Sequence, residues 1–368
     1  MSLLFWLLLG SSLFLLIWTV CNSLFLPALG RRSLREQPLV TILVPMRNEA
    51  RNAAALIQTI QQLRYHNFEC IILDDQSTDD TWHILQQTSL HDPRFRLIQG
   101  GPLPKQWVGK VHACHQLSTH ANGEYLLFLD ADIRLQPDTI EQALSLLQAR
   151  QAKLLTGFPA FPVDTLLGRL LVPMQHFVIY THLPVLLANH TLWKSATAAH
   201  GAFMLFERQA YEEIGGHRAV HASLVEDVHM ARRMKEQGHR VLLANVTSHV
   251  SCYMYETNRE AWEGFAKNIF TGLGRSVPLV IGMTCFYVLL YLLPFALLPL
   301  SLLYGPLLLL PALLLWLQRL YIDYDTRQQL WLFLSQPLAI IALIAIMNYS
   351  MYLALLKKSY YWKGRTYS

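Results

Sequence analysis

The sequence predicts an α/β domain with a largely parallel sheet, carried between transmembrane helices at the N- and C-terminal ends. Apolar, strand-like runs alternate with helix-like segments between residues 39 and 130, an order typical of parallel sheets. Three stretches carry no charged side chain, namely residues 1–30, 276–318 and 328–356. Only 15% of the residues are charged as a result, against about 25% in ordinary soluble domains. Residues 31–275 have a soluble composition and form the predicted domain.

Residues 1–30 predict one transmembrane helix, because about 20 apolar residues are needed to cross a bilayer. The block lacks the basic start and the small-residue cleavage site of a secretory signal peptide. Arg31, Arg32 and Arg35 follow it, which is typical of the cytoplasmic end of a membrane helix. We therefore expect a multi-pass protein of the plasma membrane, with residues 31–275 in the cytoplasm.

The cysteine pattern and the net charge narrow the compartment and the partners. The five cysteines have no metal-binding spacing and suit a reducing compartment better than a disulfide framework. The net charge of +5 is modest, and no basic tract is present, so nucleic acid is not expected as a partner. Anionic lipid head groups or phosphates fit this charge.

The elements of the middle domain follow one another in a regular order. Four short apolar runs predict strands at residues 39–45, 69–73, 95–99 and 124–130. Helical spacing predicts a helix after each of the first three strands, within residues 47–63, 74–87 and 109–121. Asn48 is the expected cap of the first helix, and Ser77 with Asp80 resembles a capping box for the second. Such continuous apolar strands indicate a sheet covered on both faces.

Polar side chains follow three of these strands at the point where each strand ends. The carboxyl ends of parallel strands meet at one edge of a sheet, where open α/β sheets bind ligands. We therefore expect these side chains to converge on one ligand. They are Pro45, Arg47 and Glu49 after the first strand, Asp74 and Asp75 after the second, and Asp130 and Asp132 after the fourth.

The chemistry of this set predicts a nucleoside diphosphate that carries a transferable group. Asp130 and Asp132 suit Mg²⁺ or Mn²⁺, which take one or two carboxylates together with substrate phosphates. Lys110 follows Gly109, where backbone can approach a ligand, and is a natural partner for a diphosphate. The carboxylates after the second strand can accept hydrogen bonds from a base.

Five sequence segments resemble family 2 glycosyltransferases with the GT-A fold. They are "VPMRNEA", "LDDQSTDDT", "LDADI", "HGAFMLFERQAYEEIGGH" and "VEDVHMARRMKEQGH", and they occur in the family's order between residues 38 and 250. The resemblance implies that the donor is a nucleotide sugar and that a divalent cation acts as Lewis acid for the departing diphosphate. Lys110 would face the diphosphate, Asp130 would approach the nucleotide sugar and Asp132 would bind the metal. The nucleoside would contact Pro45, Arg47, Glu49, Asp74 and Asp75.

The same resemblance assigns the acceptor side of the reaction. Asp227 would be the general base that deprotonates the acceptor, with Glu226 in support, and direct displacement would invert the anomeric carbon. His200, Gly201 and Trp262 are expected near the acceptor. His200 has no second ligand at metal spacing, so hydrogen bonding is favoured over metal binding for it.

Two groups of family members resemble the chain more narrowly. The segments "WVGKVHAC" and "WKGRTYS" are similar to membrane enzymes that glycosylate carotenoid acids, and "LPKQWVGK" and "VEDVHMARR" to hopanoid-associated members. The Gln-x-x-Arg-Trp signature of processive synthases is replaced by "NREAWEGFAKN", with Trp262 and Lys267 as the nearest analogues. We expect transfer of a single sugar, most simply from UDP-glucose, to a lipid such as a carotenoid acid.

Several alternatives stay open from the sequence. The acceptor could be a hopanoid, a polyprenyl phosphate or a glycerolipid. A nucleotidyltransferase also uses metal-binding carboxylates on an α/β sheet, but it has no role for the Glu226–Asp227 pair. A non-catalytic lipid-binding membrane protein is the alternative outside the enzymes. Trp107 either lines the sugar site or is a packing residue.

The remaining segments concern the membrane. Residues 276–356 predict about three apolar spans, the first two joined near residues 304–306, with no buried charge that would suggest transport. Residues 166–193, broken by Pro173 and Pro184, predict interfacial helices that admit a lipid acceptor, with a buried core element as the alternative. The basic, aromatic tail at residues 357–368 is expected to anchor in the interface. Three spans after a cytoplasmic domain would place this tail outside, which conflicts with its basic charge.

Overall fold

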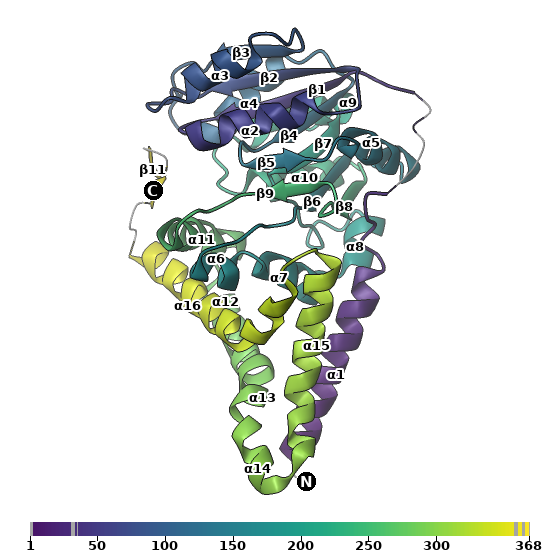
Figure 1. Ribbon diagram of the computed structural model, residues 1–368, viewed down its shortest axis with the longest axis vertical. Helices are drawn as coiled ribbons and strands as arrows, with labels where there is room; N and C mark the ends of the chain where they lie inside the picture. Colours follow the sequence, from purple (N-terminus) through teal and green to yellow (C-terminus); the bar gives the residue numbers. More distant parts are fainter. Residues whose placement is uncertain (1–2, 31–33, 35, 357–359, 363–364, 368) are drawn as a thin grey trace. The chain divides into compact units, whose positions relative to one another are not determined.

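The chain forms two compact units, whose helices and strands are labelled in Figure 1. The computed structural model describes residues 3–30, 34, 36–356, 360–362 and 365–367. The sheet unit comprises Leu26–Ala160 and Leu183–Tyr253, and the membrane unit comprises Met1–Phe25, Phe161–His182 and Met254–Ser368. The predicted domain of residues 31–275 thus includes residues 161–182 and 254–275, which group with the membrane helices instead.

The sheet unit is built on a seven-stranded sheet in the order β3-β2-β1-β4-β7-β6-β8. The four predicted strands are confirmed as β1, β2, β3 and β4, and they pair in parallel. β7 is inserted antiparallel between β4 and β6, so the sheet is largely but not wholly parallel. The bounds are β1 Val40–Met46, β2 Phe68–Asp74, β3 Phe95–Gln99, β4 Tyr125–Leu129, β6 Leu154–Phe158, β7 Phe203–Glu207 and β8 Val241–Asn245.

Helices cover this sheet because each presents an apolar face at helical spacing. In α2, the side chains of Ala53, Leu56 and Ile60 lie on one face and are fully buried. A further pair of short strands, β5 and β9, lies beside the main sheet. The bounds are α2 Ala50–Gln61, α3 Thr81–Ser89, α4 Gly109–Thr119, α5 Thr139–Ala149, α8 Val185–His190, α9 Arg208–Glu213, α10 Glu226–Glu236, β5 Ile133–Leu135, β9 Val250–Cys252 and the 3-10 helix η1 Gly216–Val220.

The core of the sheet unit fixes the helices that carry the candidate site. Buried side chains from α4 (Val111, Leu117) and α10 (Met230, Met234) join Phe128 of β4 in one cluster. α4 and α10 both contact η1. The first residues of α4 and α10 are therefore held by a close-packed interior rather than by loops.

The helix starts differ from two sequence predictions. Asn48 was expected to cap the first helix, but α2 begins after Glu49, and Asn48 has a left-handed φ of 52°. Ser77 was expected to open the second helix, but α3 begins after Asp80. The Ser77 hydroxyl instead accepts a hydrogen bond from the Asn48 N–H at 2.9 Å. Both polar residues therefore link the β1 and β2 loops, a long-range role that a local capping pattern does not reveal.

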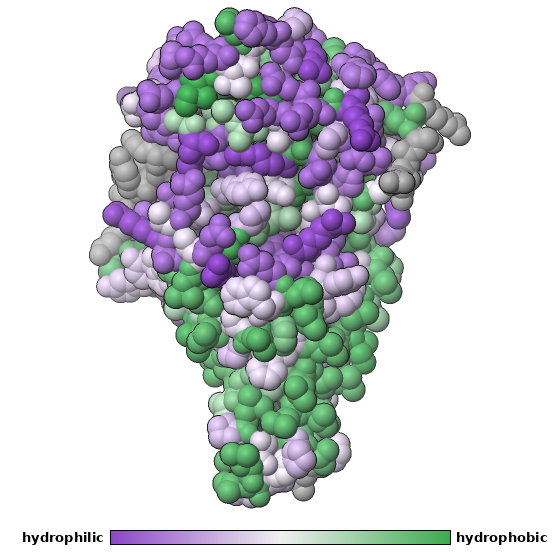
Figure 2. Space-filling view, viewed as in Figure 1, coloured by the Kyte–Doolittle hydropathy of each residue, from purple (hydrophilic) through white to green (hydrophobic). Residues whose placement is uncertain are grey.

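The membrane unit contains four helices that are long and apolar enough to cross a membrane, as predicted. Hydrophobic residues gather over their surfaces (Figure 2). The second and third candidates are separated at Gly305, whose φ of 103° favours glycine. The candidates are Leu3–Ser23 (α1), Val277–Tyr304 (α12 Val277–Tyr287, a π-helical turn, α13 Leu293–Ala296 and α14 Ser301–Tyr304), Pro306–Asp325 (with α15 Leu310–Asp325) and Leu330–Leu355 (with α16 Gln336–Leu355).

The expectation that the spans bury no charge is wrong. Arg319 and Asp323 lie on α15 and form an ion pair at 2.8 Å, with 0% and 1% of their side chains exposed. Arg319 also donates to Gln336 of α16 at 3.2 Å. The uncharged stretch of the sequence ends at Gln318, one residue before this pair. Since buried polar groups in a membrane need partners, the pair links two candidate spans.

The segment predicted as interfacial divides between the two units. α6 (Leu166–Leu171) and α7 (Met174–His182) belong to the membrane unit, where α7 packs on α1 and α6 on α16. α8 belongs to the sheet unit, where the Asn189 side chain exchanges two hydrogen bonds with Leu243 of β8. The interfacial role of α6 and α7 stays a prediction, and α8 matches the alternative of a packed element.

Part of the predicted membrane flanks lies outside the described residues. This applies to Arg31, Arg32 and Arg35, and to the tail lysines at positions 357, 358 and 363. The last described strands, β10 (Tyr360–Trp362) and β11 (Arg365–Tyr367), pair as an antiparallel hairpin. α11 (Asn258–Gly272) precedes the C-terminal spans in the membrane unit.

Candidate active site

The ends of β1 and β2 bring together the residues predicted to hold a nucleoside. Pro45 and Met46 of β1 pair with Leu73 and Asp74 of β2. The Arg47 guanidinium donates to the backbone oxygens of residues 75 and 76, at 2.5 and 2.9 Å. Because this hydrogen bonding ties the β1 loop to the β2 loop, the two strand ends form one continuous surface.

The acidic members of this surface are buried and held in place. Asp74 and Asp75 are only 5% and 3% exposed, and Glu49 is 6% exposed. The Glu49 carboxylate accepts from the Asn52 amide at 2.8 Å, and its N–H donates to the Thr81 hydroxyl at 2.8 Å. Buried carboxylates held in this way are pre-oriented acceptors for the N–H groups of a base.

Gly100 is a site residue that the sequence prediction missed. It follows β3, and its N–H donates to the Asp74 carbonyl at 2.8 Å. A Cβ atom at Gly100 would lie 3.0 Å from Leu73 Cδ2 and 3.3 Å from the Asp74 oxygen. Glycine therefore allows the β3 end to approach the Asp74–Asp75 backbone. The Gly100–Gly101 pair directly after a strand is the signal that could have found it.

Lys110 lies at the centre of the charged cluster, in the first turn of α4. Its ammonium contacts Asp130 Oδ1 at 2.7 Å and Glu226 Oε1 at 3.1 Å. Burial alone would lower the pKa of Lys110, but the charges of Asp130 and Glu226 outweigh it and raise this pKa well above its usual value. Lys110 is therefore a fixed cation that joins the end of β4 to the start of α10.

Asp227 lies beside Glu226 in the first turn of α10 and accepts two backbone hydrogen bonds. Its oxygens accept from the N–H groups of Gly201 at 3.0 Å and Val228 at 2.8 Å. Burial, and next the charge of Glu226, raise the pKa of Asp227 to about 7, against the lowering effect of these N–H groups and Lys110. A carboxylate that changes protonation near neutral pH is suited to general base catalysis.

At Gly201 a side chain would crowd the Lys110 ammonium. A Cβ atom there would be 3.0 Å from the Lys110 ammonium, 3.4 Å from Glu226 Oε1 and 3.7 Å from the Asp227 Cβ. The absence of a side chain thus allows the residue 200–202 segment to lie against all three charged residues. The structure places Gly201 against this charged cluster, and its role on the acceptor side stays a prediction.

His200 is buried next to this segment. The backbone N–H of His200 donates to the Thr156 hydroxyl at 3.1 Å, and the imidazole Nδ1 accepts from the Ala202 N–H at 3.3 Å. The imidazole also packs against the Phe158 ring with centroids 4.9 Å apart. Burial lowers the pKa of His200 to about 4, so the ring is neutral near pH 7. These contacts support the predicted hydrogen-bonding role.

Asp130 and Asp132 follow β4 and fit a divalent cation that also binds a diphosphate. Both charges act on the Cys252 thiol, whose pKa is raised by burial and then by Asp132 and Asp130, so the two carboxylates lie in one neighbourhood. The contact of Asp130 with the Lys110 ammonium shows that this carboxylate faces a cation. Within the described ranges, no group of three or more histidine, cysteine or acidic residues could hold a metal by itself. Mg²⁺ and Mn²⁺ commonly use one or two carboxylates and complete their shell with substrate oxygens.

Trp262 is not part of this cluster in the sheet unit. It lies on α11 in the membrane unit, where its ring packs against Tyr349 with centroids 5.4 Å apart. Its predicted place on the acceptor side therefore stays a prediction. Two residues that the sequence prediction missed, Arg218 and His221, line a surface pocket of the sheet unit with Trp107.

Comparison with known proteins agrees with this geometry. Residues 41–215 match the family Glycosyl transferase family 2, a range that contains the Lys110 and Asp130 contacts and ends before Asp227. The 4,4'-diaponeurosporenoate glycosyltransferase of Staphylococcus haemolyticus is 23% identical over 270 residues, which cover 72% of this chain and 69% of that protein. The Staphylococcus aureus protein of the same name is 25% identical over 243 residues, or 65% of this chain and 63% of its own length.

A solved structure shares the fold over almost the whole chain. It is a mannosyltransferase from Pyrobaculum calidifontis in complex with GDP-Man and Mn²⁺. The two chains are 18% identical and superpose with a TM-score of 0.58, covering 95% of this chain and 98% of the other. The chain therefore shares its fold with this solved structure.

Proposed function

We propose that this chain transfers one sugar from a nucleotide sugar to a lipid acceptor, with inversion at the anomeric carbon, which is supported by the match of residues 41–215 to Glycosyl transferase family 2. The observation that carries the proposal is the Lys110 bridge. One ammonium contacts Asp130, on the donor side, and Glu226, next to the proposed base Asp227. Donor and acceptor groups are thereby held within the reach of one side chain.

Each residue has a defined task in this proposal. The nucleoside lies on the surface formed by Arg47, Glu49 and the Asp74–Asp75 pair, and Lys110 faces the diphosphate. Asp130 and Asp132 hold a divalent cation, which supplies Lewis-acid stabilisation of the departing diphosphate when bound. Asp227 accepts the proton of the attacking hydroxyl through the carboxylate that Gly201 and Val228 orient. Direct attack by the acceptor oxygen on the anomeric carbon breaks the bond between this carbon and the diphosphate, and the configuration of the carbon is inverted.

The proposed donor is UDP-glucose. GDP-mannose is the donor to compare with UDP-glucose, because the mannosyltransferase from Pyrobaculum calidifontis was solved with GDP-Man. The comparison tests both the nucleobase and the sugar of the proposed donor. Purified full-length protein should release nucleoside diphosphate from one of the two donors only when a lipid acceptor is present. Nucleotide binding without acceptor-dependent release would instead favour the non-catalytic alternative.

Two classes of acceptor are proposed. A carotenoid acid is supported by the name of the staphylococcal relatives, whose acceptor is a carboxylate. A hydroxyl lipid, such as a hopanoid or a glycerolipid, is supported by the charges of the site. Asp130 and Glu226 contact Lys110, and Asp132 and Asp227 lie within two residues of them in the chain, so a carboxylate acceptor would meet repulsion there. An ionised carboxylate also needs no general base.

The linkage in the product distinguishes these classes. A sugar ester of a carotenoid acid is cleaved by mild alkali, whereas a glycoside of a hydroxyl lipid survives it. We expect an alkali-stable product from a hydroxyl lipid, with activity that depends on Asp227. An alkali-labile product that the Asp227→Asn variant still forms would favour the carotenoid acid and remove the base from the mechanism.

Removal of the divalent cation should abolish transfer. Without the cation, the negative charges of Asp130 and Asp132 would face the negatively charged diphosphate. Lys110 is a close cationic partner of Asp130. We expect EDTA to stop nucleoside diphosphate release, and added Mg²⁺ or Mn²⁺ to restore it. Full activity of EDTA-treated, metal-free protein would contradict the assigned role of the Asp130–Asp132 pair.

We further propose that the protein is a multi-pass component of the plasma membrane with its sheet unit in the cytoplasm. The four candidate spans and the scattered free cysteines support this placement. In sealed spheroplasts, a label that cannot cross the membrane should fail to modify cysteines introduced in the sheet unit. Labelling of those cysteines before lysis would place the unit outside.

A further inference from the structure

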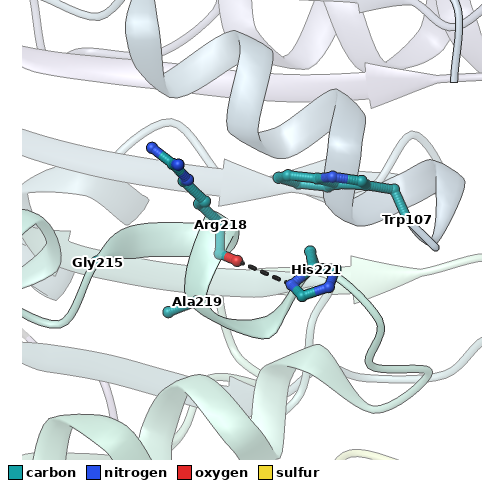
Figure 3. A pocket seen from close by; sticks show the side chains of 5 residues that line it. All are labelled: Trp107, Gly215, Arg218, Ala219 and His221. Atoms are coloured by element: carbon teal, nitrogen blue, oxygen red, sulfur yellow. Dashed lines mark hydrogen bonds between the residues drawn. The ribbon is translucent and has the colours of Figure 1, made fainter. Parts of the chain in front are cut away.

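A pocket of about 460 Å³ lies on the sheet unit beside the proposed active site. It is lined by Trp107, Gly215, Arg218, Ala219 and His221, and Figure 3 shows the Trp107 ring above His221 with Arg218 next to them. Trp107 precedes α4, which carries Lys110, and His221 follows η1 in the loop that leads to the Glu226–Asp227 pair. The pocket is thus formed by the two chain segments that deliver the catalytic residues.

The walls of the pocket are held rigidly. The Val108 N–H donates to the His221 carbonyl at 2.8 Å, which joins the two segments. The Trp107 ring stacks on His115 with centroids 5.3 Å apart, and lies 5.4 Å from the His221 ring. At Gly216, with φ of 51°, a Cβ atom would lie within 3 Å of the Tyr211 ring. A pocket with a fixed shape binds a ligand at a lower entropic cost.

The charge of the pocket is positive. Arg218 is exposed and has no acidic partner among the residues that the structure describes. The nearest acidic side chains in sequence are engaged elsewhere, Glu212 with Arg208 at 2.8 Å and Glu213 with His239 at 2.9 Å. Arg218 also contributes, after burial and His112, to the lowered pKa of His115 behind the tryptophan. The guanidinium is therefore available to an anion.

We propose that Trp107, Arg218 and His221 bind an anionic group of the acceptor, a phosphate or carboxylate that is separate from the hydroxyl receiving the sugar. Guanidinium groups bind such oxyanions through paired hydrogen bonds, and the imidazole of His221 can add a donor. The Trp107 ring packs against the apolar part next to the anion. This inference rests on the proposed lipid glycosyl transfer and specifies its substrate class, an amphiphile with both a hydroxyl and an acidic group.

The location of the pocket explains why the anion would be bound there. Asp130 and Glu226 already contact Lys110 and repel a second anion, so an acidic group on the acceptor needs a different cation. Lys110 lies near η1, because α4, which carries it, packs on that helix. A lipid could therefore place its hydroxyl at Asp227 while its acidic group reaches Arg218 of η1.

Two lipids that differ in the anionic group test the proposal. Phosphatidylglycerol has two free hydroxyls and a phosphate, and diacylglycerol has a free hydroxyl and no anionic group. With full-length protein, donor and Mg²⁺, we expect kcat/KM to be about tenfold higher for phosphatidylglycerol, since one charged hydrogen-bonded contact is added. In Arg218→Gln this preference should disappear, so that kcat/KM becomes about equal for the two lipids. Arg150→Gln, at another exposed arginine of the same unit, should keep the preference.

Direct binding makes the proposal testable even if neither lipid is glycosylated. The full-length protein in detergent should retain more phosphatidylglycerol than diacylglycerol in native mass spectrometry, and Arg218→Gln should lose that excess. Equal retention by the wild type and Arg218→Gln would overturn the pocket. Displacement by inorganic phosphate alone, with no lipid preference, would show a site for free phosphate and also overturn it. Retention without sugar transfer to any lipid would instead count against the proposed function.

Discussion

Lys110 is the residue on which the electrostatics of the site depend. Its ammonium is the close cationic partner of Asp130 and Glu226, and it also reduces the pKa shift of Asp227. A substitution of Lys110 would therefore disturb donor binding and the base together. The roles of the two sides are better separated by changing residues that contact only one of them.

Asp227→Asn should reduce kcat about 10²–10⁴-fold, because the amide cannot accept the acceptor proton. Gly201 donates to Oδ2 and Val228 to Oδ1, so the single amide oxygen keeps one of these backbone hydrogen bonds, and the melting temperature of the variant shows whether the fold persists without the other. Nucleoside diphosphate release, measured with saturating lipid, checks this expectation. Binding of the donor should be unchanged in a titration of the same variant. Near-normal turnover would remove Asp227 from the mechanism.

The pH dependence follows from the raised pKa of Asp227, which is about 7 in the folded protein. The base is competent only when deprotonated, so kcat/KM should rise with pH and level off above about 7. The free energy of unfolding depends on pH in the opposite direction. The native state binds the proton more tightly than the unfolded chain, so this group contributes stability below pH 4 that is lost as the pH rises through 7. A rate profile without an acid limb near 7 would show that another group titrates.

Gly201→Ala tests the close approach of the residue 200–202 segment to the charged residues. The added methyl group would lie 3.0 Å from the Lys110 ammonium, which must then move away from Asp130 or Glu226. We expect activity to fall at least tenfold in protein with a normal melting temperature. Gly30→Ala is the matched control, since nothing lies within 4 Å of a Cβ atom there. Equal activity of the two variants would contradict the packing argument.

The sequence identified the charged candidate residues and Gly201, but it did not identify Gly100, Arg218 or Arg319. Asp130, Lys110 and Asp227 follow or precede recognisable elements, so their motifs predict their meeting. Gly100 carries only the weak signal of a glycine pair after a strand, and Arg218 carries no pattern, because its place in the pocket arises from contacts between segments that are distant in the sequence. Arg319 was missed for another reason. Its ion pair with Asp323 lies just beyond an uncharged stretch, and burial of the pair is visible only in three dimensions.

At the scale of elements, α10 joins the acceptor side of the site to the preceding loop. Its first turn carries Glu226 and Asp227, and near its other end the buried Lys235 ammonium donates to the carbonyls of Ala188 and Ala196, at 2.7 and 2.8 Å. That loop continues into His200 and Gly201. One helix therefore orients the base and fixes the segment that hydrogen-bonds to it.

Lys235→Met should destabilise the sheet unit by about 1–3 kcal/mol, because it leaves buried carbonyl groups without their donor. The free energy of unfolding, or the melting temperature in detergent, measures the effect. Lys194→Met is the control. Lys194 lies in the same loop with 60% of its side chain exposed, and its ion pair with Glu236 should contribute less than about 1 kcal/mol. Similar losses in both variants would refute the anchoring role of Lys235.

The elements were predictable where local patterns determine them. The strands that became β1 to β4 are short apolar runs between helical segments, and all four were found in a parallel arrangement. The antiparallel insertion of β7 between β4 and β6 was not predicted. Strand order depends on which pairs bury most surface together, and a pattern read along one segment contains no information on its partner.

At the scale of the whole molecule, four helices are long and apolar enough to cross a membrane, which is the basis of the proposed membrane location. We expect the chain to remain in the membrane pellet after an alkaline carbonate wash. A variant that lacks residues 1–25 should also remain there, because three candidate spans are still present. Release of the full-length protein into the supernatant would show that these helices serve as a soluble core instead.

The central claim is that this membrane protein moves a sugar from a nucleotide to a lipid through Asp227. Transfer of radiolabel from a nucleotide [¹⁴C]sugar into the organic phase tests it most directly, with full-length protein, Mg²⁺ or Mn²⁺ and extracted membrane lipids. We expect labelled lipid to form together with an equal amount of nucleoside diphosphate in the wild type, and about 10²–10⁴-fold more slowly in Asp227→Asn. Label that stays in the aqueous phase with every donor, or equal rates in the two proteins, would contradict the claim.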